Sequence, residues 1–320
     1  MPDWAAFAAA TVALTLLLLY FTRRSQRLLE RARIVDSRGD VDSRGDIVDA
    51  GRDARVESGD AESDGPQGDN AESDDIEGSG IEGGSPEGDD AEGGETESDR
   101  LDGHPPDDRP VLTTRLLLAN AATSQAAGLA VLAAVAWWTA VPAAAFGVGG
   151  PHPTLGASGV ASLGASGVAS LGVPGVVALG VAAGAVLAAG NEAAARLGSR
   201  VGLAPSDRLR AAMAPGTAGE WVLLLGVALP VVAVFEEALF RGALVGALAV
   251  GFAVDPWLLA VGSSVAFGLG HGAQGRLGIV VAGALGLALA GLFVATGSLL
   301  VPVVAHYVVN AAEFAVHERS

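Results

Sequence analysis

The sequence predicts an all-α protein, a polytopic transmembrane bundle of about seven membrane segments with a disordered acidic linker. Three observations support this fold class. Half of the 320 residues are hydrophobic, and most of these lie in apolar runs long enough to cross a bilayer. Most acidic residues lie in one segment between the first two runs. Polar residues within the later runs are spaced as on one face of a helix.

The acidic segment accounts for the net charge of −17. Val35–Pro110 contains 26 acidic residues and 6 Arg, whereas the rest of the chain contains 10 acidic residues and 13 Arg. The segment is rich in Gly and Ser and lacks aromatic residues, so it cannot bury enough apolar surface to offset the entropy of ordering. We expect a disordered, solvated linker there, with a partner-binding tail as the alternative. The linker separates a membrane anchor (residues 1–34) from a helical membrane bundle (residues 111–320).

Two further features of composition limit the interpretation. All 19 basic residues are Arg, which together with the acidic linker suggests a high-salt organism, where short Debye lengths screen self-repulsion of the linker. The chain has no Cys, so disulfides and thiolate chemistry are excluded. We expect the bilayer as a partner and no nucleic acid.

Seven apolar stretches are the predicted membrane segments. The first is followed by "TRRSQRLLERAR", and Arg marks the cytoplasmic side. A cleaved signal peptide carries its positive charge before the apolar region, so we expect an anchor helix and a cytoplasmic linker. The fourth stretch exceeds one span, which suggests a bent or re-entrant extension. The stretches are Trp4–Phe21, Leu116–Val141, Val173–Gly190, Trp221–Val254, Trp257–Leu269, Leu277–Ala295 and Ser298–Phe314.

Three of these stretches contain polar residues, and each charged one costs about 2.5–3.5 kcal/mol at the bilayer centre. "EEALFR" covers Glu236–Arg241, "FGLGH" covers Phe267–His271 and "HYVVN" covers His306–Asn310. The last two motifs each begin and end on one helix face, since their end residues are four apart. A buried ion pair or a packed histidine explains any one motif alone, but the three together predict a site.

The first motif divides into a pair and a single carboxylate. Glu237 and Arg241 are four residues apart, so we predict an ion pair that lowers the cost of burying both charges. Glu236 is rotated by about 100° from Glu237 along an α-helix and faces elsewhere. We therefore predict a structural Glu237–Arg241 pair and a free, reactive Glu236.

These side chains suit amide hydrolysis. Glu236 is a candidate general base for a water molecule, and His271 is a candidate to hold that water. His306 and Asn310 are candidates to donate hydrogen bonds to the oxyanion of a tetrahedral intermediate. "GxSxG" and "HExxH" do not occur, so serine nucleophiles of that type and standard zincins are excluded. Zn²⁺ held by Glu236, His271 and His306 remains an alternative.

The motifs "EEALFRG", "FGLGH" and "HYVVNA" resemble those of the CPBP family of CAAX proteases and bacteriocin-processing enzymes. The family pattern is a double Glu followed by x-x-x-Arg, then Phe-x-x-x-His, then His-x-x-x-Asn or Asp. This chain carries all three in order, within a protease core at about residues 219–316. The resemblance implies an all-helical intramembrane endopeptidase that cleaves a membrane protein or peptide.

The resemblance also implies a role for each motif residue. Glu236 is the water-activating glutamate, with His271 as its partner, and His306 and Asn310 form the oxyanion site. The supporting residues are Glu237, Arg241 and Phe267. Members were long labelled metalloproteases, but the motifs supply no third strong metal ligand, so we favour the glutamate mechanism without a metal cofactor.

Two other functions compete with the protease. A non-catalytic scaffold, chaperone or sensor derived from this fold would usually have lost a motif residue, and none is missing here. A transporter that uses Glu236 and the histidines as a proton relay would more often show inverted repeats, and the two halves of the chain show none.

Overall fold

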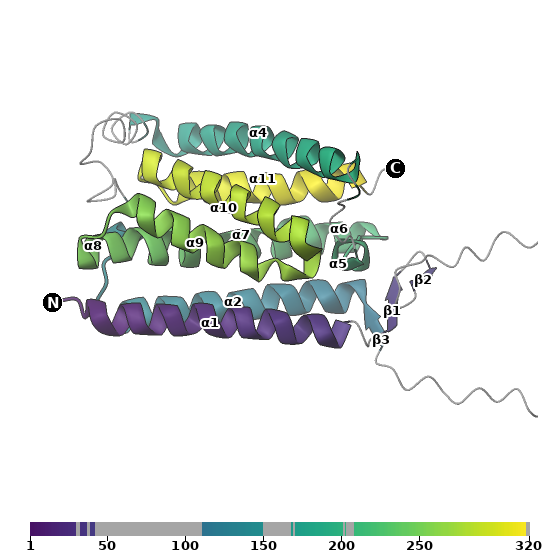
Figure 1. Ribbon diagram of the computed structural model, residues 1–320, viewed down its shortest axis with the longest axis horizontal. Helices are drawn as coiled ribbons and strands as arrows, with labels where there is room; N and C mark the ends of the chain where they lie inside the picture. The colour runs from purple at the N-terminus through teal and green to yellow at the C-terminus, as the bar shows by residue number, and fades with distance from the viewer. Residues whose placement is uncertain are drawn as a thin grey trace, which may run out of the picture. The chain divides into compact units, whose positions relative to one another are not determined.

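The computed structural model describes residues 1–29, 33–36, 39–41, 111–149, 168, 170–200, 202 and 208–317. Within these ranges the chain is a bundle of helices (Figure 1), as the sequence predicts. Most of the predicted linker, residues 42–110, lies outside the described part, so its expected disorder is not addressed.

A small sheet lies where the linker leaves and rejoins the bundle. β1 (Arg33–Asp36) pairs antiparallel with β2 (Gly39–Val41) and parallel with β3 (Val111–Thr113). β1 and β2 therefore extend into the start of the segment that composition predicts to be disordered. The three short strands do not change the fold class, because every other described element is helical.

Six helical segments in the described part of the chain are long and apolar enough to cross a bilayer. Five correspond to α1 (Trp4–Leu29), α2 (Thr114–Trp138), α4 (Gly172–Arg200), α10 (Gly275–Thr296) and α11 (Leu300–His317). The remaining predicted segment, the fifth along the chain, is α9 (Pro256–Gly270), which is apolar but has 15 residues, fewer than the roughly 20 that span a bilayer. The chain is an integral membrane protein.

The other spanning segment is one continuous helical run over residues 218–252, all of which the structure describes. It joins α6 (Ala218–Leu223), the π-helical η2 (Leu224–Ala228), α7 (Leu229–Glu237), the π-helical η3 (Ala238–Ala247) and α8 (Leu248–Phe252). The sequence predicts a bent or re-entrant extension here, whereas the run continues as a helix with two widened stretches. We call this run the central rod.

Local sequence explains the ends and the first widening of the central rod. Thr217 and Glu220 form a capping box at its start. Pro230 lacks an N–H and clashes with the carbonyl of the preceding turn, and the wider turns of η2 relieve this conflict. Asp255 accepts a hydrogen bond from Trp257 N at 2.8 Å and begins α9, so the "DP" sequence ends one helix and starts the next.

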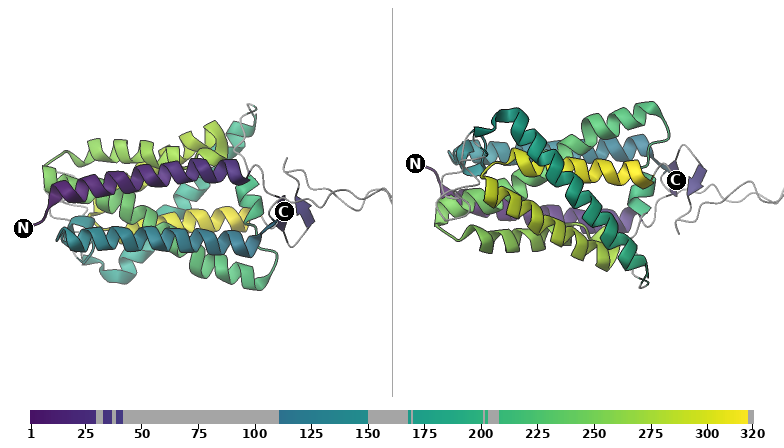
Figure 2. Two further views of the ribbon diagram at one scale, coloured as in Figure 1. Left: turned by 90° about the horizontal axis from the view of Figure 1, so that it is seen from below. Right: turned by 90° about the horizontal axis from the view of Figure 1, so that it is seen from above.

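The central rod is surrounded by the other helices (Figures 1 and 2). Its α7 part packs against α2 and α11, and its η3 part packs against α9, α1 and the short η1 (Ala143–Phe146). The core between these elements contains six buried aromatic rings, those of Phe7, Phe146, Phe235, Phe240, Phe267 and Phe293. This packing brings three motif-bearing helices, α7, α9 and α11, together.

The outer helix α4 lies along α11 and crosses it at a slant (Figure 2, right). Gly184 permits the close approach, because a Cβ at this position would lie 2.7 Å from both the Ala305 carbonyl oxygen and Val308 Cβ. Small residues at such crossings allow membrane helices to pack through their backbones. α4 therefore supports the helix that carries His306.

Charge is distributed unequally between the two ends of the bundle. The ends of α1 and α4 and the starts of α2 and α10 lie at one end (Figure 1), and they carry Arg23, Arg24, Arg115, Arg196, Arg200 and Arg276. At the opposite end the described side chains include two acids, Asp3 and Asp255, and no Arg. Arg241 is the described arginine that lies between the two ends.

Candidate active site

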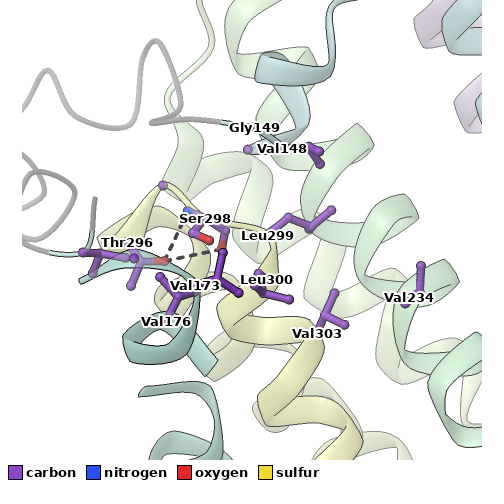
Figure 3. Close-up of a pocket in the computed structure, with 14 residues that line it drawn as sticks. Val148, Gly149, Val173, Val176, Val234, Thr296, Ser298, Leu299, Leu300 and Val303 are labelled. Carbon is purple, nitrogen blue, oxygen red and sulfur yellow. Dashed lines mark hydrogen bonds between the residues drawn. The ribbon is translucent and has the colours of Figure 1, made fainter. Parts of the chain in front are cut away.

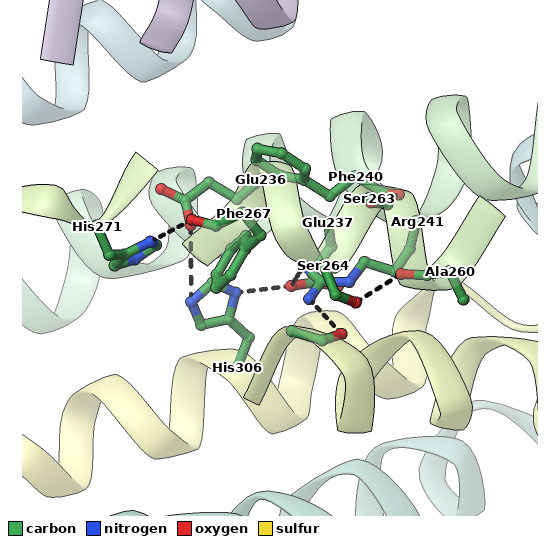
Figure 4. A network of polar contacts seen from close by, with 11 residues as sticks. Glu236, Glu237, Phe240, Arg241, Ala260, Ser263, Ser264, Phe267, His271 and His306 are labelled. Carbon is green, nitrogen blue, oxygen red and sulfur yellow. Dashed lines mark hydrogen bonds and ion pairs between the residues drawn. The ribbon is translucent and has the colours of Figure 1, made fainter. Parts of the chain in front are cut away.

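The polar residues of the first motif lie at the junction of α7 and η3. Glu237 and Arg241 are buried, with 0% and 1% of their surfaces exposed. Arg241 Nη1 donates to Glu237 Oε1 over 2.8 Å, so the predicted ion pair forms (Figure 4). The pair forms although Arg241 and the three residues before it lie in the π-helical η3, which begins directly after Glu237.

Arg241 has two further partners, which the sequence does not predict. Its Nη2 donates to the Gly286 carbonyl oxygen on α10 over 2.9 Å. Its Cζ lies 4.6 Å from the centre of the Phe267 ring, which is a cation–π contact. The guanidinium is thus held by three helices at once, and the carboxylate of Glu237 is held with it.

His306 lies between the two glutamates. Its Nδ1 is 2.7 Å from Glu237 Oε1, and its Nε2 is 3.8 Å from Glu236 Oε2 (Figure 4). A proton on Nδ1 is donated to the Glu237 carboxylate, which leaves Nε2 facing Glu236. His306 is buried, with 2% of its surface exposed, so both contacts are made away from solvent.

Glu236 differs from Glu237 in its surroundings. Its side chain is 13% exposed, whereas that of Glu237 is fully buried. Its Oε2 is buried and makes no hydrogen bond within the described residues. A buried carboxylate oxygen without a donor is costly, and such an atom calls for a partner that is not part of the chain. Glu237 Oε2 is also buried without a hydrogen bond within the described residues, so the feature that distinguishes Glu236 is the partial exposure of its side chain.

His271 lies at the C-terminal end of α9 and is bound to its own helix. Its Nδ1 lies 2.9 Å from the Phe267 carbonyl oxygen, and its ring contacts the Phe267 ring at a tilt of 39° with centroids 4.5 Å apart. Among the described residues we find no hydrogen bond between His271 and Glu236. The nearest imidazole to Glu236 is that of His306, which is not the partner that the family resemblance implies.

Asn310 follows His306 by one turn on α11 and is partly buried. It makes no hydrogen bond to any described residue, so its amide is not engaged by the network. Phe267 lies between the other groups, with its ring centre 5.8 Å from that of His306 and 5.1 Å from that of Phe240. The structure thus joins Glu236, Glu237, Arg241, Phe267 and His306 in one cluster, next to His271.

The geometry of the cluster also bears on the metal alternative. No three His, Cys, Asp or Glu side chains converge as metal ligands within the described ranges. One nitrogen of His306 faces Glu237, and one nitrogen of His271 faces a backbone carbonyl. Metal-ligating histidines make such contacts through their other ring nitrogen, so the point against Zn²⁺ is that Glu236, His271 and His306 do not converge as a ligand set. No step below passes through a metal.

A separate pocket of about 570 Å³ lies between α4, α7 and the α10–α11 turn (Figure 3). Its walls include Val173 and Val176 of α4, Val234 of α7 and Val303 of α11. Thr296 and Ser298 supply its polar side chains, and no titratable residue lines it. The pocket has no group for proton transfer, so the candidate chemistry belongs to the Glu236 cluster.

Comparison with known families gives one match. Residues 218–312 match the family described as type II CAAX prenyl endopeptidase Rce1-like, and this segment contains every motif residue of the cluster. This segment is a domain of the CAAX protease family. No curated protein and no solved structure gives a match.

The CAAX protease domain covers less than a third of the 320 residues. It begins with the central rod and ends within α11, so α1, α2 and α4 lie outside it. These three helices nevertheless pack on the rod or on α11. The bundle around the site is thus built by parts of the chain that the family match does not include.

Two contacts of the site had no counterpart among the motifs. Gly286 binds Arg241 through its carbonyl, and Ser263 Oγ donates to the Phe240 carbonyl oxygen over 2.7 Å, which ties α9 to η3. A signal for Gly286 exists in the sequence, because small residues recur at every fourth position of α10, at Gly278, Ala282, Gly286 and Ala290. Such spacing indicates a helix face packed closely on a neighbour.

Proposed function

We propose that this CAAX protease hydrolyses peptide bonds of membrane-associated proteins or peptides with a water molecule activated by Glu236. The observation that carries the proposal is Glu236 Oε2, which makes no hydrogen bond within the described residues and lies 3.8 Å from Nε2 of His306. A water molecule lies within a hydrogen bond of both atoms if it is roughly 2.8 Å from each. Both atoms accept hydrogen bonds when Glu236 is ionised and His306 is neutral.

The proposed reaction has two steps. Glu236 removes a proton from the water, whose oxygen attacks the carbonyl carbon of the scissile peptide bond. Glu236 then donates that proton to the leaving nitrogen as the carbon–nitrogen bond breaks, which gives a carboxylic acid and an amine. Glu236 serves as base and then as acid, so the chain is unchanged after each cycle.

The negative charge of the intermediate needs a donor. We propose that the Asn310 amide supplies one hydrogen bond, because it is not engaged elsewhere among the described residues and follows His306 on the same face. We propose His306 as the second donor, and its Nδ1 is held by the Glu237 carboxylate over 2.7 Å. Arg241 in turn holds Glu237 in place through the contact between Nη1 and Oε1.

Purified protein in liposomes, incubated with a library of membrane-inserting peptides, tests the proposal. We expect cleaved peptides by mass spectrometry, with one solvent oxygen in each new carboxylate when the reaction runs in H₂¹⁸O. The reconstituted His306→Asn variant serves as the inactive control. Absence of cleavage by folded wild-type protein across the library would support the scaffold or transporter alternative.

We also propose that the arginine-rich end of the bundle is cytoplasmic, and the linker with it. The support is the position of the Arg residues at one end of the described bundle. A protease recognition sequence inserted after Gly78 should be cut in inverted membrane vesicles and protected in intact cells. The same sequence inserted within residues 151–167 should show the opposite pattern, and cleavage of the Gly78 insertion from outside would reverse the orientation.

A further inference from the structure

We propose that Gly286, on a helix without any motif residue, is a positioning residue for the proposed hydrolysis and acts through Arg241. The inference rests on the proposed function only for its kinetic effect. The contact itself is between the Gly286 carbonyl oxygen and Arg241 Nη2, over 2.9 Å. Gly286 does not touch Glu236 or the reacting water, so it is not a catalytic residue.

Arg241 connects Gly286 to the site. Its Nη2 binds the Gly286 carbonyl while its Nη1 binds Glu237 Oε1 over 2.8 Å. The same Glu237 oxygen lies 2.7 Å from His306 Nδ1. A displacement of the guanidinium is therefore passed to Glu237 and from there to the imidazole that faces Glu236.

The absence of a side chain at Gly286 is what allows this arrangement. A Cβ at this position would lie 3.2 Å from Phe267 Cδ1, 3.4 Å from Ser264 Cα and 3.5 Å from Arg241 Nη2. Ser264 Cα belongs to the α9 backbone and cannot rotate away. The contact with Phe267 Cδ1 is the tight one, so the Phe267 ring must move by a few tenths of an ångström, and this ring contacts both the Arg241 guanidinium and the His306 ring.

Small displacements at a reacting centre have large kinetic effects. A misplacement of about 1 Å lowers rates by roughly 100-fold, because proton transfer and attack need aligned atoms. We expect Gly286→Ala to lower kcat by about 10-fold and to change KM by less than about twofold, since substrate binding does not involve this residue.

The matched control is Gly283→Ala on the same helix. A Cβ at Gly283 would meet Ser264 O at 3.7 Å, which is an ordinary contact, so this variant should keep the wild-type kcat. A second measurement does not need activity. The ring-nitrogen NMR signals of His306, assigned by their loss in His306→Asn, should shift in Gly286→Ala and stay unchanged in Gly283→Ala.

Each outcome decides the inference. If Gly286→Ala keeps the wild-type kcat per folded molecule and does not move the His306 signals, Gly286 is only a packing residue and the inference is wrong. If Gly286→Ala does not accumulate, Arg241→Lys takes its place, because one ammonium group cannot bridge Glu237 and Gly286 as a guanidinium does. If the His306 signals are unchanged in Arg241→Lys, the inference is also wrong. If wild-type protein cleaves no peptide, the proposed hydrolysis fails and the NMR comparison alone decides the positioning.

Discussion

Glu236→Gln is expected to lower kcat by about 10²- to 10⁴-fold, the usual contribution of a general base. The amide keeps the size and polarity of the side chain but takes up no proton from water. The protein should still accumulate in the membrane, because a neutral amide is less costly to bury than a carboxylate. The measurement is kcat per folded molecule in liposomes.

The same chemical change at Glu192 provides the control. Glu192 forms an ion pair with Arg196 near the end of α4, where the arginine is 71% exposed. Glu192→Gln should leave kcat unchanged. Activity in Glu236→Gln within about twofold of the wild type would remove Glu236 from the proposed mechanism.

A strong chelator completes this test. With Glu236 as the base, we expect wild-type activity to survive chelation. If a chelator abolished activity and Zn²⁺ restored it, and if metal analysis found about one equivalent, the glutamate-only mechanism would be wrong. The CAAX protease assignment would remain, because it rests on the family match and not on the metal.

Arg241→Ala is expected to reduce the amount of folded protein severely. It leaves the carboxylate of Glu237 buried without compensation, which costs about 3–5 kcal/mol. The variant also removes the donor to the Gly286 carbonyl. The measurement is the fraction of protein recovered from membranes as a monodisperse species, together with its thermal midpoint.

An exposed pair with the same spacing is the control for Arg241→Ala. Arg196 and Glu192 are also four residues apart, with Nε and Oε1 separated by 2.6 Å. Arg196→Ala should cost no more than about 1 kcal/mol, because water compensates the remaining charge. If Arg241→Ala instead were as stable as the wild type but inactive, Arg241 would act in the reaction and not as a structural partner.

The sequence predicts the helices well because each apolar run must satisfy its own backbone in a bilayer, and a helix is the local solution. The Glu237–Arg241 pair was predictable for the same reason, since it depends on spacing within one turn. The π-helical stretches were not, because periodicity arguments assume 3.6 residues per turn. An apolar run also does not give the length of its helix: the run in α9 predicts a membrane segment, but the helix has only 15 residues.

The contacts between helices could not be obtained from the sequence. His306 and Glu237 are 69 residues apart, and nothing local indicates that the imidazole faces both glutamates. The motifs identify which residues take part, but they do not say which atoms meet. Gly286 could not be predicted for the same reason. Its proposed role depends on its backbone carbonyl, a group that every residue has, and on the space left by its missing side chain.

The position of the ion pair within a single turn also bears on how the protein is made. Glu237 and Arg241 enter the membrane together on the central rod, before α10 and α11 have been synthesised. Charged residues at a helix centre each oppose insertion by about 2.5–3.5 kcal/mol. A partner four residues away neutralises both charges during insertion, without waiting for a later helix. The Gly286 carbonyl and His306 then join an ion pair that has already been delivered to the bilayer interior.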